Sequence, residues 1–180
     1  MALVCLDTNI VIWGILKECR KGEEANLEKA KSLIEELAKS RDEVLLPAIV
    51  VGETLAGVNK EKLNLANNLL QQHFMIAPFD TAAAKFYASI FQTKKPNFFD
   101  AKEKRWSIPR KAYNADCAIV ATAISRKASV IYSEDPHLVK LAENEPVEVK
   151  ILPPIPPKLL TLPIEEQQPP QKSGKVMPIR

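Results

Sequence analysis

The sequence has few of the residues from which many enzyme sites are built. Its 180 residues include three cysteines, two histidines and five glycines. The cysteines form no CxxC pair, which excludes a disulfide framework and a cysteine zinc site and is typical of a reducing compartment. Two histidines leave little room for a histidine metal site. The glycines form neither a GxGxxG motif nor a P-loop phosphate cradle.

Long apolar runs are also missing. The longest, 44–51 and 115–124, are too short to cross a bilayer. No charged segment followed by an apolar stretch opens the chain, so we expect no signal peptide, a cytoplasmic location and no membrane contact. The formal charge of +3 is too small for a protein that coats DNA through a basic surface.

Composition divides the chain into a body and a tail. Residues 1–152 are predicted to form one domain, whereas 153–180 contain eight of the 14 prolines. Proline breaks helices and cannot donate to a sheet, so the tail is expected to be extended or disordered. It could also wrap the body or pack on a neighbouring chain through its apolar residues, which are Leu159, Leu160, Leu162 and Ile164.

Short buried strands alternate with amphipathic helices along the body. The patterns predict strands at 2–6, 43–46, 75–77, 128–132 and 147–151. They predict helices at 9–19, 26–40, 47–58, 60–73, 80–92, 113–127 and 135–142, with a long polar connection over 93–112. This alternation predicts an α/β sandwich in which helices cover both faces of a parallel sheet.

Four acidic residues stand near the ends of these elements, where an open α/β sheet binds its ligands. Asp7 and Asp135 follow strands, Asp116 opens a helix and Glu53 lies within one. Each also has a structural explanation. Asp116 could satisfy free amides at a helix start, Asp135 could cap a helix, and Asp7 could turn the chain into its first helix.

Glu53 is the most informative of the four. Apolar residues flank it at helical spacing, so we expect it on or beside a buried face, where a lone carboxylate is costly. Gly52 and Gly57 are poor helix formers and indicate that a backbone or a ligand comes close. The alternative is a surface glutamate at the edge of the buried stripe.

Four carboxylates gathered at one sheet edge would repel one another without a cation. None of the four has Lys or Arg as its immediate sequence neighbour. Carboxylate oxygens suit Mg²⁺ or Mn²⁺, and such an ion can lower the pKa of a bound water and stabilise charge on a phosphate. The pattern therefore predicts a divalent-cation site.

The segments LDTNIVIW, VVGETLAGV, NADCAIVATA and VIYSED resemble the PIN-domain family, in that order and at similar spacing. The resemblance covers about residues 2–151, and the layout is most similar to the VapC-like toxin ribonucleases of type II toxin–antitoxin pairs. It implies a PIN-like three-layer α/β/α sandwich with a central, mainly parallel sheet. It also implies a Mg²⁺- or Mn²⁺-dependent endoribonuclease that cleaves single-stranded RNA by hydrolysis, a homodimer, and a possible antitoxin partner.

Matched residue by residue, the resemblance implies a set of catalytic, metal-binding acids: Asp7, Glu53, Asp116 and Asp135. The supporting residues it implies are Thr8, Asn9 and Ser133. The fourth motif departs from the family pattern of Thr, then Asp and a nearby aromatic. Because Glu134 precedes Asp135 here, either residue could supply the fourth acid.

The connection over 93–112 is strongly basic and is longer than in compact family members. It carries seven Lys and Arg residues against two acids, a local charge of +5, interleaved with Phe98, Phe99 and Trp106. Basic side chains hold phosphates and aromatic faces stack bases. We predict that it contacts RNA, through Arg105, Trp106, Arg110 and Lys111 above all. Alternatively, it is a solvated loop whose aromatic side chains pack on the body.

Two other functions compete with the nuclease. The chain could be a catalytically silent PIN-fold module that binds RNA or protein, which the unusual fourth motif favours. It could also be a flavodoxin-like phosphoacceptor domain, which clusters acids in the same way. A phosphoacceptor domain of this type needs a Lys after a late strand. This chain has Ser133, Glu134 and Asp135 there instead, which argues against that function.

Overall fold

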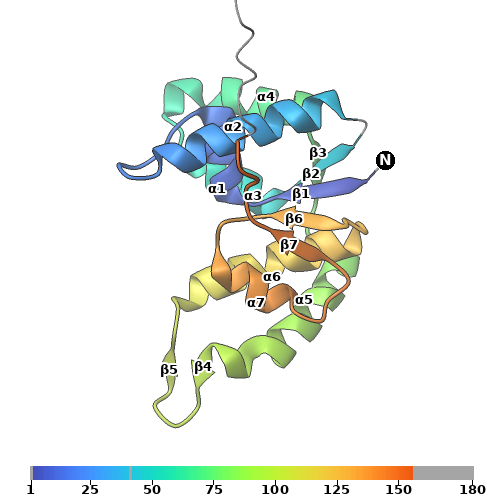
Figure 1. Ribbon diagram of the computed structural model, residues 1–180. Coiled ribbons are helices and arrows are strands. Elements are labelled where there is room, and N and C mark those ends of the chain that lie inside the picture. Colours follow the sequence, from blue (N-terminus) through green and yellow to red (C-terminus); the bar gives the residue numbers. More distant parts are fainter. Residues whose placement is uncertain (1, 41, 156–180) are drawn as a thin grey trace, which may run out of the picture.

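The computed structural model describes residues 2–40 and 42–155. Its centre is a five-stranded, wholly parallel sheet with the strand order β3-β2-β1-β6-β7 (Figure 1). The strands are β1 (Leu3–Leu6), β2 (Glu43–Pro47), β3 (Met75–Ala77), β6 (Val130–Tyr132) and β7 (Glu148–Lys150). β1 lies in the middle, and Val4 pairs with Val44 on one side and Val130 on the other. Val4, Cys5 and Leu6 of β1 are buried because helices cover both faces.

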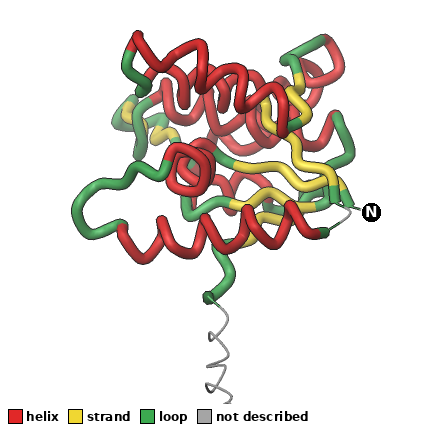
Figure 2. Tube along the Cα trace, turned by 90° about the horizontal axis from the view of Figure 1, so that it is seen from above, coloured by secondary structure: helices red, strands yellow, loops and turns green. Residues whose placement is uncertain are grey.

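Helices form the two outer layers, which confirms the predicted three-layer α/β/α sandwich. In Figure 1, α2 (Glu24–Lys39) and α4 (Leu63–His73) lie above the sheet. Below it lie α5 (Thr81–Lys94), α6 (Arg110–Ser125) and α7 (Pro136–Ala142), and Figure 2 shows the layers from above. The short α1 (Thr8–Val11) and α3 (Ala48–Ala56) begin at the carboxyl ends of β1 and β2.

Among the glycines that the structure describes, Gly14 has the closest approach to a neighbouring element. A π-helical turn over Ile12–Leu16 continues α1 and packs against α2. A Cβ on Gly14 would lie 2.8 Å from Ile34 Cγ1 and 3.2 Å from the Ala30 carbonyl oxygen. The prediction of a close approach at Gly52 and Gly57 was wrong. A Cβ on Gly52 would meet nothing within 4 Å, and on Gly57 it would make an ordinary contact at 3.6 Å.

The connection predicted over 93–112 is mostly ordered structure. α5 extends to Lys94 and a 3₁₀ turn covers Lys95–Asn97. An antiparallel hairpin of β4 (Phe99–Asp100) and β5 (Arg105–Trp106) follows and projects from the body (Figure 1). α6 begins at Arg110, three residues earlier than predicted. The remaining predicted elements agree to within a few residues, except that a 3₁₀ turn over Lys60–Lys62 precedes α4.

The described chain ends just after the last strand. Leu152 is buried, and its amide donates to Glu134 Oε1 at 2.7 Å, which fixes the chain beside the fourth motif. Most of the predicted tail, residues 156–180, lies outside the described residues. Within the ranges 2–40 and 42–155, no helix is both long and apolar enough to span a bilayer.

Candidate metal centre

Asp7 lies directly after β1 and is 5% exposed. The amide of Thr8 donates to its Oδ1 at 2.6 Å, and the buried Ser133 hydroxyl donates to its Oδ2 at 2.7 Å. β1 and β6 are neighbours in the sheet, so the residues after them meet at its carboxyl edge. Burial raises the pKa of Asp7 to about 6, although both hydrogen bonds oppose the shift.

Asp116 is half-buried on α6, and its pKa is raised to about 7. Burial is the main cause, followed by the charges of Asp135, Asp7 and Glu53. The residue stands beyond the first turn of α6, so it does not satisfy free amides at the helix start. The sequence-based alternative for Asp116 is therefore wrong, and its carboxylate accepts no hydrogen bond from the described residues.

Glu53 is exposed on α3 and stands beside the buried residues Val50 and Thr54, so of the predicted positions, on or beside a buried face, it takes the second. The alternative of a surface glutamate describes its exposure correctly. Its Oε2 accepts a hydrogen bond of 2.6 Å from the Thr8 hydroxyl, which ties α3 to the start of α1. Its charge helps to raise the pKa values of Asp7 and Asp116, so it belongs to the same group of acids.

Asp135 caps α7 and also acts on the other acids. Its Oδ1 accepts from the amide of His137 at 2.8 Å, as predicted for a helix cap. Its amide donates to Ser133 Oγ at 3.0 Å. Its charge raises the pKa of both Asp7 and Asp116. Glu134, by contrast, accepts the Leu152 amide and makes no such contribution. Asp135 thus acts on Asp7 and Asp116, and its role as the fourth metal-binding acid stays a prediction.

His137 is a neighbour of the site to which the sequence analysis assigned no functional role. Its Nδ1 lies 2.8 Å from Asp135 Oδ1, and its ring lies 6.1 Å from that of the buried Phe98. The sequence contains a signal for this position of His137. Asp135 as a helix cap, followed by Pro136, places His137 in the first turn of the helix, beside the capping carboxylate. His137 therefore links the fourth acid to the base of the β4–β5 hairpin.

The donor set fits a hard divalent cation. Across the ranges 2–40 and 42–155, no Lys or Arg forms an ion pair with any of the four acids. The same ranges contain no group of three or more Asp, Glu, His or Cys side chains arranged to hold a metal ion. The carboxylates of Glu53 and Asp135 are instead hydrogen-bonded to Thr8 and His137. What supports a cation is the oxygen chemistry of the donors, together with the raised pKa values of Asp7 and Asp116, which burial causes first and the charges of neighbouring acids second.

The predicted supporting residues differ in what they do. Thr8 and Ser133 hold acids of the site through hydrogen bonds. Asn9 is exposed, and its side chain makes no hydrogen bond with a described residue. A supporting role for Asn9 therefore stays a prediction.

The predicted RNA-binding residues lie on the hairpin and at the start of α6. Arg105, Arg110 and Lys111 are exposed, and Arg105 pairs with Glu103 at 3.1 Å. Arg110 precedes Asp116 by six residues, about 9 Å along the helix axis.

The aromatic residues of this region pack on the body. Phe98 is 2% exposed, so base stacking by Phe98 is excluded. Trp106 is half-buried against Phe91, Phe99 and Tyr113. The alternative that the aromatic side chains pack on the body is thus correct for both.

The family model for the PIN domain matches residues 4–144, and the chain belongs to the PIN domain family. Comparison of the sequence with curated proteins finds no match.

Several solved structures share the fold. The chain is similar to VapBC2 from Rickettsia felis bound to a promoter DNA fragment, with 17% identity, a TM-score of 0.57, and 83% of this chain and 98% of that chain covered. It is also similar to VapBC-1 from nontypeable Haemophilus influenzae, with 20% identity, a TM-score of 0.58 and the same coverage. DNA-bound VapBC from Salmonella typhimurium matches at 17% identity and a TM-score of 0.57, with 84% and 99% of the two chains covered.

Proposed function

We propose that this protein is a divalent-metal-dependent endoribonuclease that cleaves single-stranded RNA. The observation that carries the proposal is the grouping of four acids from separate parts of the chain. Thr8 and Ser133 link Asp7 by hydrogen bonds to Glu53 and to the Asp135 amide, and the charges of these three acids act on Asp116. Burial, and after it the charges of neighbouring acids, raise the pKa values of Asp7 and Asp116 to about 6 and 7. Membership of the PIN domain family supports a nuclease in particular.

Asp7, Glu53, Asp116 and Asp135 would hold Mg²⁺ or Mn²⁺. When bound, such an ion lowers the pKa of a coordinated water and stabilises negative charge on a phosphate. Ser133 and the Thr8 amide fix the orientation of the Asp7 carboxylate. In the hydrolysis, a bond forms between water oxygen and phosphorus while the bond to the 3′-oxygen breaks. That oxygen takes a proton, which leaves a 3′-hydroxyl and a 5′-phosphate.

Arg105, Arg110 and Lys111 would contact the phosphates of the RNA. All three are exposed, and α6 carries two of them and also Asp116, so phosphate binding and cleavage would share one rigid element. Trp106 is half-buried, and its exposed part would supply a surface for a base.

We further propose that the protein is the toxin of a toxin–antitoxin pair and that an antitoxin protein is its partner. The fold shared with three VapBC structures supports this assignment. A homodimer is the proposed assembly. Exposed Met75, Phe79 and Phe86, on β3 and around the start of α5, offer apolar area for a second copy.

Cleavage of a labelled single-stranded RNA, with Mn²⁺ or with a chelator, tests the proposal. The parent protein should cut only with the metal, and Asp7→Asn and Asp116→Asn should reduce the rate at least about a hundredfold. Glu61→Gln, an exposed acid on the 3₁₀ turn before α4, is the matched control and should cut at the parent rate. If Asp7→Asn cuts as fast as the parent, the nuclease proposal fails.

A catalytically silent RNA- or protein-binding module is the second candidate. The absence, within 2–40 and 42–155, of a side-chain group arranged to hold a metal favours it. Such a module would bind RNA equally well with and without Mn²⁺ and would not cut it.

A further inference from the structure

A second basic segment lies near the acids, between the π-helical turn and α2. It covers residues 17–22, which we call the α1–α2 loop, and it carries Lys17, Arg20 and Lys21. All three are exposed, and none of them forms an ion pair with another residue of 2–40 or 42–155. Glu18 is the one acid among 17–22, so three cations against one acid give the loop a net charge of +2.

Hydrogen bonds hold the α1–α2 loop in one conformation. Lys17 ends the π-helical turn in the left-handed region, at φ 58°, and its amide donates to the carbonyl of Ile12. Glu23 Oε2 accepts from the indole Nε1–H of the buried Trp13 at 3.1 Å and from the Arg20 amide at 3.1 Å. The Glu23 carboxylate therefore bonds to neutral donors rather than to a cation of the loop. Because the backbone is already ordered, little conformational entropy is lost when the loop binds an anion.

The α1–α2 loop lies on the same side of the sheet as the acids. Asp7 follows β1, and only the four residues of α1 and the five of the π-helical turn separate it from Lys17. At about 1.5 Å per residue these turns rise about 13 Å. Figure 1 shows the loop before α2 and the β4–β5 hairpin projecting on one side of the molecule, with α1 between them, and Figure 2 shows the loop at the same margin. Asp7, at the start of α1, therefore lies between two basic segments.

A strand of RNA that crosses the acids meets repulsion from four carboxylates. Arg105, Arg110 and Lys111 lie on the hairpin and at the start of α6, on one side of that charge. At physiological salt the Debye length is about 8 Å, so these cations do little for phosphates that lie farther than this beyond the acids. We propose that the α1–α2 loop binds those phosphates and that the RNA strand crosses the acids between this loop and the β4–β5 hairpin. This inference rests on the proposed function, because it takes single-stranded RNA as the ligand.

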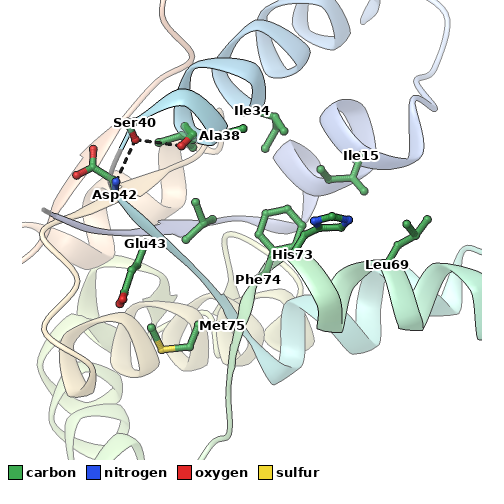
Figure 3. A pocket seen from close by; sticks show the side chains of 12 residues that line it. Ile15, Ile34, Ala38, Ser40, Asp42, Glu43, Leu69, His73, Phe74 and Met75 are labelled. Carbon is green, nitrogen blue, oxygen red and sulfur yellow. Dashed lines mark hydrogen bonds between the residues drawn. The ribbon is translucent and has the colours of Figure 1, made fainter.

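The opposite edge of the sheet has a different surface. A hollow of about 830 Å³ lies there, at the amino ends of β2 and β3, and its lining is mostly apolar (Figure 3). Asp42 and Glu43 line it too, and neither forms an ion pair with a Lys or Arg of the described part of the chain. These two acids would repel phosphates, whereas the α1–α2 loop would attract them.

Binding of a labelled single-stranded RNA over a range of salt concentrations tests the inference. A chelator is present throughout, so that the RNA is not cut. Lys17→Ala combined with Arg20→Ala and Lys21→Ala should reduce the slope of log K against log salt concentration by about 2, since each phosphate contact on a single strand contributes about 0.7.

The control removes the same charge from the amino edge of the sheet. Lys39 ends α2, Lys127 follows α6 and Lys140 lies on α7, and all three are exposed. Their combined replacement by Ala should leave the slope at the parent value. An equal fall in the two triple variants would mean that net charge alone is responsible, and would overturn the inference. A parent protein that binds no RNA at any of these salt concentrations would overturn it as well.

Cys19 gives a test that needs no substitution of the cations. It is exposed on the α1–α2 loop, whereas Cys5 and Cys117 are buried. A photoreactive group attached to Cys19 should cross-link to the RNA, because RNA held at the loop is present at about millimolar local concentration. The yield should be at least about tenfold above that from the same reagent on Lys39→Cys in a Cys19→Ser background, where RNA at about micromolar concentration meets the group only from solution. Equal yields at the two positions would overturn the inference.

The outcomes separate this inference from the nuclease proposal, because both measurements record binding and neither needs cleavage. Suppose that the parent protein cuts RNA only with Mn²⁺, but that the loop variant and the Cys19 cross-link behave as their controls do. The nuclease proposal then stands and the loop inference fails. A protein that shows both loop effects and does not cut RNA would give the reverse result.

Discussion

The hydroxyl of Ser133 donates to Asp7 Oδ2 over 2.7 Å, although the two residues are 126 positions apart. Both side chains are buried, one after β6 and the other after β1. The same Ser133 oxygen accepts the amide of Asp135. One hydroxyl therefore sets the orientation of the first acid and the start of the fourth motif. The positions of the acids therefore depend on the pairing of β1 with β6 as much as on the helices that follow these strands.

Replacement of Ser133 by Ala should shift the pH dependence of RNA cleavage. The hydrogen bond from Ser133 lowers the pKa of Asp7, so the loss of this bond should raise that pKa above about 6. The acidic limb of the plot of cleavage rate against pH should then move to higher pH. Stability should fall by about 1–3 kcal/mol, because the buried Asp7 oxygen loses its partner. Ser125→Ala, at the far end of α6, is the control for a lost serine hydroxyl. An unmoved acidic limb would contradict this role for Ser133.

Metal binding should stabilise the protein more at neutral than at acidic pH. The pKa values of Asp7 and Asp116 are raised from 3.8 to about 6 and 7. At pH values between 3.8 and these raised pKa values, Asp7 and Asp116 stay protonated in the folded protein but are ionised in the unfolded chain. The free energy of unfolding of the metal-free protein should therefore fall as the pH rises through this range. Mn²⁺ competes with the same protons. Its stabilisation, measured by thermal unfolding, should be small near pH 5 and largest above pH 7.

A Mn²⁺ effect of equal size at both pH values would contradict this linkage. Asp7→Asn supplies the control, because it removes one titrating acid and one proposed ligand together. Its stability without metal should depend less on pH than that of the parent.

Arg110→Ala combined with Lys111→Ala should weaken RNA binding and its dependence on salt. Both side chains are exposed at the start of α6. Loss of two phosphate contacts should reduce the slope of log K against log salt concentration by about 1.4 for a single strand. The control is Lys60→Ala with Lys62→Ala, two exposed cations on the turn before α4. A slope that changes equally in both variants would show that the effect is not specific to α6.

Gly14→Ala should destabilise the fold, whereas Gly52→Ala should not. A Cβ at Gly14 would press on Ile34 and on the Ala30 carbonyl, which should cost about 1–3 kcal/mol. A Cβ at Gly52 meets nothing within 4 Å, so Gly52→Ala should stabilise α3 by up to about 1 kcal/mol. Urea unfolding of the two variants measures both. Equal effects would contradict the described packing of the π-helical turn on α2.

The sequence pattern predicted the parallel sandwich because its strands are short and apolar and its helices are amphipathic. It also placed Asp7 and Asp135 at strand ends, where they are found. Local pattern could not show that Glu53 is exposed, because the face of α3 that is covered depends on its neighbours. The close approach of the Gly14 backbone to α2 was not predicted either, because it too depends on a neighbouring element. It depends on α2, which begins ten residues later.

The hairpin at 99–106 was predicted as part of a polar connection. Its strands are two residues long, too short to give an alternating pattern. The burial of Phe98 depends on its contacts with Tyr113 and His137, which are remote in the sequence. Arg105, Arg110 and Lys111, which charge patterning selected as RNA contacts, are exposed, and their contact with RNA stays a prediction.

The most direct measurement is a crystal structure of the parent protein soaked in Mn²⁺, with the ion located by anomalous scattering. We predict at least one peak at the carboxyl edge of the sheet, within about 2.0–2.3 Å of oxygens from Asp7 and at least one of the other three acids. The same soak of Asp7→Asn should give no peak there. A parent crystal without a peak at this edge, or with Mn²⁺ only elsewhere, would contradict the account.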